Sequence, residues 1–344
     1  MNIRELSKIA GVSPAAVSIV INNKKGVSET TRAHVKKIME QYGYNPIKLN
    51  GATDIQRNSN LKKILFLKYR THGMLVEENQ GFISIIIDAI EAECRKRQME
   101  LNIIVSDNQF KQTLSEIDFS IYAGIIVLAT ELEPELYSLL DRIAIPFVAV
   151  DNRIPTSSCS SVSIDNSGNV FQALKFFAEH GHKKIAYFRS NIEIQNFKER
   201  RESFLNSVRN LGMSHSPEYE FAVTPTLLGS YKDCKSLFTN FHTSLPTCAF
   251  ADNDSIALGA IKALKECGYK IPKDLSIIGF DDIPYSAISS PSLTTIKVSK
   301  EIIGQTAVNH LCTLIDNPSH HLKIQVPGNI IIRNSISFAE NSNC

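Results

Sequence analysis

The chain has 344 residues, of which 43% are hydrophobic and 21% are charged. This balance is ordinary for a globular protein and sufficient for two or three domains. No apolar run approaches the roughly 18 residues that a membrane-spanning helix needs, and the first residues predict a polar helix rather than a secretion signal. The seven cysteines are scattered without a Cys-x-x-Cys pair. We therefore expect a cytoplasmic protein with no disulfide framework, metal site or cofactor.

Positive charge is concentrated at the start of the chain. Residues 1–50 contain eight Lys or Arg and three Asp or Glu, a net charge of +5, whereas the whole chain carries +2, so the remainder carries −3. A basic N-terminal region on a mildly acidic body indicates a polyanionic partner.

Residues 1–46 have the pattern of three short helices. The first helix ends at Gly11, because glycine accepts the left-handed conformation of a tight exit. Ser13 can cap a second helix that begins with Pro14, and the gap of about three residues is the length of a helix-turn-helix turn. A third helix starts at Ser28. A plain three-helix bundle with a solvated basic surface is the alternative, but turn spacing, caps and charge together favour DNA binding.

The second helix has one apolar face and one face directed away from the bundle. Val17, Val20 and Ile21 fall together on the inward face at 100° per residue. The opposite face can meet a partner and carries Ala15, Ser18, Ile19 and Asn22.

These features resemble a known family of regulators. Gly11-Val12-Ser13, Val20-Ile21-Asn22-Asn23, Val27–Arg32 and Tyr42–Pro46 are similar to the DNA-binding head of the lactose-repressor (LacI/GalR) family of bacterial transcription regulators, almost without gaps over residues 3–46. The resemblance implies a helix-turn-helix domain whose DNA contacts are Ser13, Pro14, Ala15, Ala16, Ser18, Ile19, Asn22 and Tyr44.

Two positions depart from the family in ways that affect DNA binding. The family commonly has Arg or His where Ile19 stands, and Ile offers only apolar contact, so we expect an A·T-rich half-site. The family's Ala-Arg-x-Leu hinge segment matches Asn50, Gly51, Ala52 and Thr53, which are mostly weak helix formers and provide no good minor-groove wedge. We expect residues 47–60 to form at most a weak hinge helix on DNA.

The rest of the chain follows a linker at residues 47–62 and alternates short β-rich runs with amphipathic helices. One series covers about 63–151 and a second restarts at about 161. Such alternation predicts an α/β fold with parallel sheets in two lobes. Ligands of such sheets bind at the carboxyl ends of the strands, and between two lobes this becomes a hinged cleft.

The resemblance extends over roughly 63–338, through stretches such as Ser163–Asn166, Gly181–Ala186, Asn253–Gly259, Ile271–Asp282 and Pro291–Ile296. It implies a core like that of periplasmic sugar-binding proteins, in which the chain crosses between the lobes three times. We expect an effector-binding and dimerisation core at 63–340, with one lobe from 63–153 and 287–318 and the other from 154–286 and 319–340.

Several polar residues fall at predicted strand ends or helix starts, where they could converge on a hydroxyl-rich ligand. Helix caps at Asp165 and Asn253, and a surface ion pair between Arg200 and Glu199 or Glu202, are the alternatives, and the residues alone do not decide between them. The resemblance implies an effector site formed by Phe82, Asp151, Arg200, Asn253 and Asp281.

Other features narrow the effector and the chemistry. The family often has aromatic residues where Asn152 and Thr224 stand, so a flat ligand between two rings is disfavoured relative to a sugar. His182 fits a turn better than a catalytic role, and Gly279–Asp282 lacks the clustered ligands of a metal site. We find no base–nucleophile pair or phosphate loop in the sequence.

The sequence patterns and the resemblance together predict a homodimeric transcription regulator, with repression favoured over activation. It is expected to bind double-stranded operator DNA and to sense a small molecule, with a carbohydrate favoured, in its cleft. A protein co-regulator in place of the sugar is an alternative, as is a cytoplasmic sugar-binding protein without regulatory function. An α/β enzyme is disfavoured, because no catalytic constellation is present.

Overall fold

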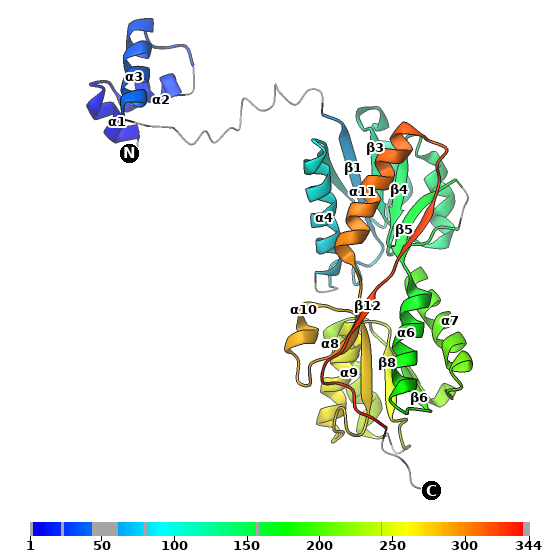
Figure 1. Ribbon diagram of the computed structural model, residues 1–344. Helices are drawn as coiled ribbons and strands as arrows, with labels where there is room; N and C mark the ends of the chain where they lie inside the picture. Colours follow the sequence, from blue (N-terminus) through cyan, green and yellow to red (C-terminus); the bar gives the residue numbers. More distant parts are fainter. Residues whose placement is uncertain are drawn as a thin grey trace. The chain divides into compact units, whose positions relative to one another are not determined.

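The computed structural model describes residues 3–21, 24–42, 61–78, 81–155, 158–241 and 243–339. The chain divides into a head, residues 1–60, and a core, residues 61–344, each with its own internal contacts (Figure 1). The predicted hinge segment at 47–60 lies outside the described residues. None of the helices in the described ranges combines the length and apolar composition needed to cross a membrane.

The head contains the three predicted helices. Gly11, at φ +64°, separates the first two, as the left-handed exit requires. The Ser13 hydroxyl accepts a hydrogen bond from the Ala16 amide at 3.2 Å, and the Ser28 hydroxyl accepts one from the Thr31 amide at 3.1 Å, so both serines act as N-caps. The helices are α1 (Ile3–Ile9), α2 (Pro14–Ile21) and α3 (Glu29–Gln41). Their buried contacts come from Leu6, Ala10, Val17, Val20 and Val35.

The first lobe of the core is built on a parallel sheet with the strand order β11-β5-β4-β3-β1-β2. Its strands are β1 (Lys63–Arg70), β2 (Glu100–Asp107), β3 (Gly124–Leu128), β4 (Phe147–Val150), β5 (Ser160–Ile164) and β11 (Lys323–Val326). Helices α4 (Phe82–Lys96), α5 (Phe110–Glu116) and α11 (Lys300–Asp316) and the 3-10 segments Phe119–Ile121 and Pro134–Arg142 accompany it. Figure 1 shows α4 and α11 side by side on one face.

The second lobe has the sheet order β12-β10-β9-β8-β6-β7, in which only β12 runs antiparallel to its neighbour. Its strands are β6 (Ile185–Ser190), β7 (Glu220–Val223), β8 (Cys248–Ala251), β9 (Ser276–Asp281), β10 (Thr294–Lys297) and β12 (Asn329–Ile331). Its helices are α6 (Asn166–Glu179), α7 (Gln195–Asn210), α8 (Leu227–Thr239), α9 (Asp254–Glu266) and α10 (Pro284–Ile288), with a 3-10 turn at Pro217–Tyr219.

The strand pairing corrects the predicted lobe boundaries. Strands β5 and β11 were expected in the second lobe, but β5 pairs with β4 and β11 pairs with β5 in the first sheet. Strand β10 was expected in the first lobe, but it pairs with β9 in the second sheet. A short strand next to a crossing carries no sequence signal for which sheet it extends, so the pattern could not place it. The chain crosses three times, after β5, after β10 and after β11, as the resemblance implied.

Helices α4 and α11 approach each other closely because α11 has glycine at position 304. A Cβ added to Gly304 would lie 2.7 Å from the Ile86 carbonyl oxygen and 2.8 Å from the Ala89 Cβ. Both neighbours belong to α4, and the first is backbone, which cannot rotate away. The glycine therefore sets the distance between two helices that cover the first sheet.

We predict that Gly304→Ala lowers the free energy of unfolding by roughly 1–3 kcal/mol, because the added methyl group overpacks this contact. Chemical denaturation of the full-length protein measures the change. Combining the substitution with Ala89→Gly, which removes one of the two obstructing groups, should restore part of the stability. An increase of about 1 kcal/mol, the usual effect of replacing glycine inside a helix, would show that the helices have room to spare.

Candidate functional site

The predicted DNA-contacting residues of the head lie on and before α2. Ser13, Pro14 and Ala15 are exposed, whereas Ala16, Ser18 and Ile19 are half-buried. The Ile19 side chain does not point simply outward, because its Cδ1 comes within 3.4 Å of the position that a Cβ on Gly26 would take. The remaining two predicted contacts, Asn22 and Tyr44, lie outside the described residues.

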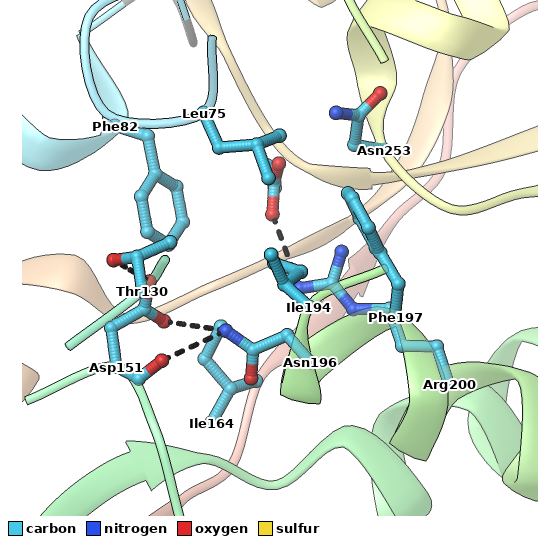
Figure 2. A pocket seen from close by; sticks show the side chains of 11 residues that line it. Leu75, Phe82, Thr130, Asp151, Ile164, Ile194, Asn196, Phe197, Arg200 and Asn253 are labelled. Atoms are coloured by element: carbon cyan, nitrogen blue, oxygen red, sulfur yellow. Dashed lines mark hydrogen bonds and ion pairs between the residues drawn. The ribbon is translucent and has the colours of Figure 1, made fainter. Parts of the chain in front are cut away.

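In the core, the five predicted effector residues line a single cavity between the lobes. Phe82 and Asp151 come from the first lobe, and Arg200 and Asn253 come from the second (Figure 2). Asp281, at the end of β9, also comes from the second lobe. Asp151, Asn253 and Asp281 stand at or just after the carboxyl ends of β4, β8 and β9, where parallel sheets place their ligands. The cavity is also lined by Leu75, Thr130, Ile164, Ile194, Asn196 and Phe197.

Asp151 is buried, with 2% of its surface exposed, and is held from both lobes. The Thr130 hydroxyl donates to its Oδ2 at 2.7 Å from within the first lobe. The Asn196 amide nitrogen, from the second lobe, donates to its Oδ1 and to its carbonyl oxygen, both at 3.0 Å (Figure 2). Burial raises the pKa of the Asp151 carboxyl to about 6, against the lowering effect of Thr130, Arg200 and Asn196. This carboxylate is thus an acceptor that already bridges the lobes.

Arg200 occupies the centre of the site and is 3% exposed. Its Nε donates to the Asn166 Oδ1 at 2.9 Å, and its Nη1 donates to the carbonyl oxygen of Asp252. Its Nη2 lies 3.7 Å from the Asp281 Oδ1, and its guanidinium carbon lies 3.7 Å from the centroid of the Phe280 ring. The alternative of a surface ion pair with Glu199 or Glu202 is therefore wrong, because the guanidinium is buried and directed into the cleft.

Both cleft carboxylates sit in unusual backbone conformations. Asp151 has φ +63° and Asp281 has φ +112°, in the region that favours glycine. Strain of this kind persists where surrounding structure enforces it and concentrates at binding sites. Lys300, at the start of α11 in the first lobe, donates to the carbonyl oxygen of Asp281, so a second polar contact crosses between the lobes.

Two of the alternative interpretations were helix caps, and both caps are present. The Asp165 carboxylate accepts from the Gly168 amide at 2.9 Å at the start of α6, and Asp165 does not line the cavity. Asn253 both caps α9, accepting from the Ile256 amide at 2.8 Å, and lines the cavity. For Asn253 the cap and a position in the cavity wall are therefore compatible, and effector binding stays a prediction.

Sequence reasoning missed Thr130, Asn196 and Phe197 as lining residues. Thr130 follows strand β3 as Asp151 follows β4, and Asn196 precedes Arg200 by four residues on one helix face, so both patterns were available in the sequence. Phe197, from the second lobe, is a second aromatic residue that lines the cavity together with Phe82. The inference from Asn152 and Thr224 concerned only those two positions and did not consider this ring, so the preference for a sugar over a flat ligand stays a prediction.

Asn152 points away from the cleft. Its amide nitrogen donates to the carbonyl oxygens of Ala129 at 2.9 Å and Leu132 at 3.2 Å, and its Oδ1 accepts from the Tyr137 hydroxyl at 3.2 Å. His182 is also structural: its ring nitrogens lie 2.8 Å from the Thr247 hydroxyl and 3.0 Å from the Ser337 carbonyl oxygen. Burial lowers the pKa of His182. Over the ranges that the structure describes, no cluster of His, Cys, Asp and Glu could hold a metal ion.

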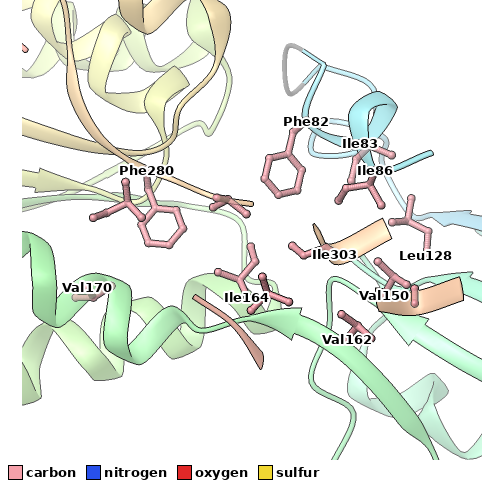
Figure 3. Close-up of a cluster of buried hydrophobic side chains, with 14 of the residues drawn as sticks. Phe82, Ile83, Ile86, Leu128, Val150, Val162, Ile164, Val170, Phe280 and Ile303 are labelled. Carbon is pink, nitrogen blue, oxygen red and sulfur yellow. The ribbon is translucent and has the colours of Figure 1, made fainter. Parts of the chain in front are cut away.

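Apolar side chains form the floor of the cleft. Figure 3 shows Phe82 on one side, Phe280 on the other and Ile164, at the first crossing, between them. The space left between the lining side chains has a volume of only about 20 Å³ for water-sized molecules, which is about the room that one water needs. The lobes are therefore closed on each other, and a sugar-sized molecule requires them to separate.

A helix-turn-helix head joined to a two-lobed α/β core with a polar cleft is the architecture of a ligand-responsive DNA-binding regulator. Residues 2–46 match the model of the bacterial regulatory proteins of the lacI family, and residues 174–336 match that of the periplasmic binding protein-like domain. The chain is 30% identical over 348 residues to the HTH-type transcriptional repressor PurR of Vibrio campbellii, covering 97% of this chain and 98% of the relative. The chain belongs to the lacI family of bacterial regulatory proteins.

Solved structures show the same fold. The Lac repressor dimer bound to operator and the anti-inducer ONPF has a TM-score of 0.71 at 19% identity, covering 98% of this chain and 99% of that one. A LacI family transcriptional regulator from Enterococcus faecium with bound ribose has a TM-score of 0.67 at 23% identity, covering 81% and 100%.

A further carboxylate, Asp254, lies behind the cleft and is completely buried. Its Oδ2 accepts from the Ile283 amide at 3.0 Å and the Ser286 hydroxyl at 2.6 Å, and its Oδ1 accepts from the Thr295 hydroxyl at 2.5 Å. It thereby joins the start of α9 to α10 and β10. Burial, together with the nearby charge of Asp281, raises the pKa of Asp254 to about 7.

We predict that Asp254 makes the protein more stable as the pH falls. Because its pKa is 3.8 without the fold and about 7 within it, the folded state binds the proton more tightly. The resulting stability is complete below pH 3.8 and is lost as the pH rises to about 7, at no more than roughly 1.4 kcal/mol per pH unit. Urea unfolding of the wild type and Asp254→Asn between pH 5 and pH 8 measures this difference, with the exposed Asp316→Asn as control. Parallel pH profiles for wild type and Asp254→Asn would contradict it.

Proposed function

We propose that this protein is a transcriptional repressor whose affinity for operator DNA is controlled by a small carbohydrate bound in the cleft. The observation that carries the effector class is the convergence of two buried carboxylates, Asp151 and Asp281, with the donor groups of Arg200 and Asn196. Carboxylates accept from neighbouring hydroxyl groups and Arg donates to them, which suits a neutral polyol. The ribose in the Enterococcus faecium relative and the repressor relative of Vibrio support this proposal. The site of action is the bacterial cytoplasm, where operator DNA lies.

A flat heteroaromatic effector is the second candidate. Phe82 and Phe197 line the cavity from different lobes, so that a flat ring bound between them could contact one phenylalanine with each of its two faces. The distinction matters because a sugar would rely on the carboxylates and a heterocycle on the two rings.

We propose further that the repressor acts as a homodimer. The second lobe has a surface groove of about 480 Å³ formed by α8, α9, α10 and the residues after α10. Its lining combines apolar side chains, including Leu227, Leu258 and Ile261, with Lys, Glu and Ser side chains. At its edge Tyr285 is 46% and Ile288 is 77% exposed, and exposed apolar surface of this kind is typical of a protein–protein interface. The likeness to a Lac repressor dimer supports a second copy as the occupant.

Selection from a random DNA library with the full-length protein tests DNA binding and dimerisation together. We expect palindromic sites with half-sites about one helical turn apart and an affinity that falls steeply with salt, because Lys and Arg displace phosphate counterions.

The selected half-sites should be A·T-rich, and Ile19→Arg should introduce a G·C pair, since Arg donates two hydrogen bonds to guanine. Selected single half-sites, or no enrichment, would count against the dimer or the DNA contact respectively.

Effector control is tested with Arg200→Ala and Asp281→Ala. We expect both variants to bind the selected operator but to lose the response to the sugar that releases or tightens the wild type, because each removes a partner from a buried polar group. Arg201→Ala is the matched control, since Arg201 is half-exposed and pairs with Glu220 at 3.0 Å. The measurement is operator affinity against a panel of D-ribose, cellobiose and adenine. An unchanged effector response in both variants would remove these residues from the site.

A further inference from the structure

Glu131 is a buried carboxylate of the core that is not among the predicted effector residues. Glu131 is 2% exposed and follows Thr130, the residue that holds Asp151, at the end of β3. Its Oε2 accepts hydrogen bonds from the backbone amides of Thr71, His72 and Gly73 at 2.8, 3.1 and 3.0 Å.

The other oxygen of the same carboxylate is also engaged by this loop. The Oε1 of Glu131 accepts from the Leu75 amide at 3.0 Å and lies 3.2 Å from the His72 Nδ1. Four backbone donors from one short segment, residues 71–75, therefore converge on one side chain. Hydrogen bonds to a carboxylate are stronger than those between neutral groups, and amide groups that surround an anion in this way form a nest.

The segment that Glu131 holds is a wall of the cleft. It leaves β1 and carries no regular helix or strand, so without Glu131 these four amides would lack an intramolecular acceptor. Leu75 is 2% exposed and lines the cavity, and Phe82 follows at the start of α4 (Figure 2). The position of Leu75 is thus determined by a side chain that does not itself line the cavity.

We propose that Glu131 is a positioning residue for the effector: it fixes loop 71–75 as a rigid wall and so sets, through Leu75, the size of the molecule that the cleft admits. This inference rests on the proposed function of the cleft as an effector site. The two residues after β3 then have different roles. Thr130 holds the Asp151 carboxylate, and Glu131 holds the loop that carries the apolar side chain of Leu75.

The first test measures the loop itself and needs no ligand. Glu131→Gln keeps the shape but replaces one acceptor oxygen by a donor, which cannot accept from the amides. Hydrogen exchange in the full-length protein should become about tenfold faster or more at residues 71–75. Glu133→Gln, an exposed glutamate two residues further on, is the matched control and should leave this exchange unchanged. Equal exchange in wild type and Glu131→Gln would overturn the proposal.

The second test measures size selection by calorimetry with D-ribose and cellobiose. We expect the ratio of the two dissociation constants to shift toward the larger sugar by about tenfold in Glu131→Gln. Leu75→Ala should shift it in the same direction without faster exchange at the remaining amides, and it serves as the second variant if Glu131→Gln fails to fold. A ratio that is unchanged in both variants would overturn the size-setting role. If neither sugar binds the wild type, the carbohydrate proposal fails, and the exchange measurement alone decides whether Glu131 holds the wall.

Discussion

The buried charge at the cleft is the constraint on which the rest of the core depends. Asp151 and Asp281 are almost completely removed from water, and an unpaired carboxylate in such a place costs several kcal/mol. Arg200 compensates them, but only because α7 brings its guanidinium to the carboxyl ends of the strands and Asn166 and Phe280 fix it there. The site therefore requires two sheets whose carboxyl ends face each other. It also requires a helix, α7, that places the Arg200 guanidinium between them.

The same polar groups connect the lobes to each other. Asn196 donates across the cleft to Asp151, and Lys300 donates across it to Asp281. A ligand that donates to the Asp151 carboxylate must compete with Asn196, so binding there and lobe separation are linked. By thermodynamic reciprocity, any change that the ligand makes to DNA affinity is matched by a change that DNA makes to ligand affinity. The three crossings after β5, β10 and β11 are the covalent paths for this coupling.

Several residues of the site also maintain the fold. Asn253 caps α9 and lines the cavity, and its neighbour Asp254 joins three segments behind it. Thr130 and Glu131, adjacent in sequence, hold Asp151 and the loop at 71–75 respectively. Functional side chains at the ends of regular elements are well positioned for this reason, and their substitution affects stability as well as binding.

The sequence by itself determined the helix-turn-helix head and the α/β alternation, because caps, glycine turns and strand periodicity are local signals. The five predicted lining residues came from the resemblance to the family, since the residues alone left helix caps and surface ion pairs open as alternatives. The tertiary structure decided which sheet β5, β10 and β11 join, since a short strand near a crossing has no local mark of its partner. It also decided that the Asn152 side chain points away from the cleft, into the interior of the first lobe, while Phe197 lines the cleft. Such directions depend on packing between segments distant in sequence, as does the convergence of four amides on Glu131, which no spacing in the chain records.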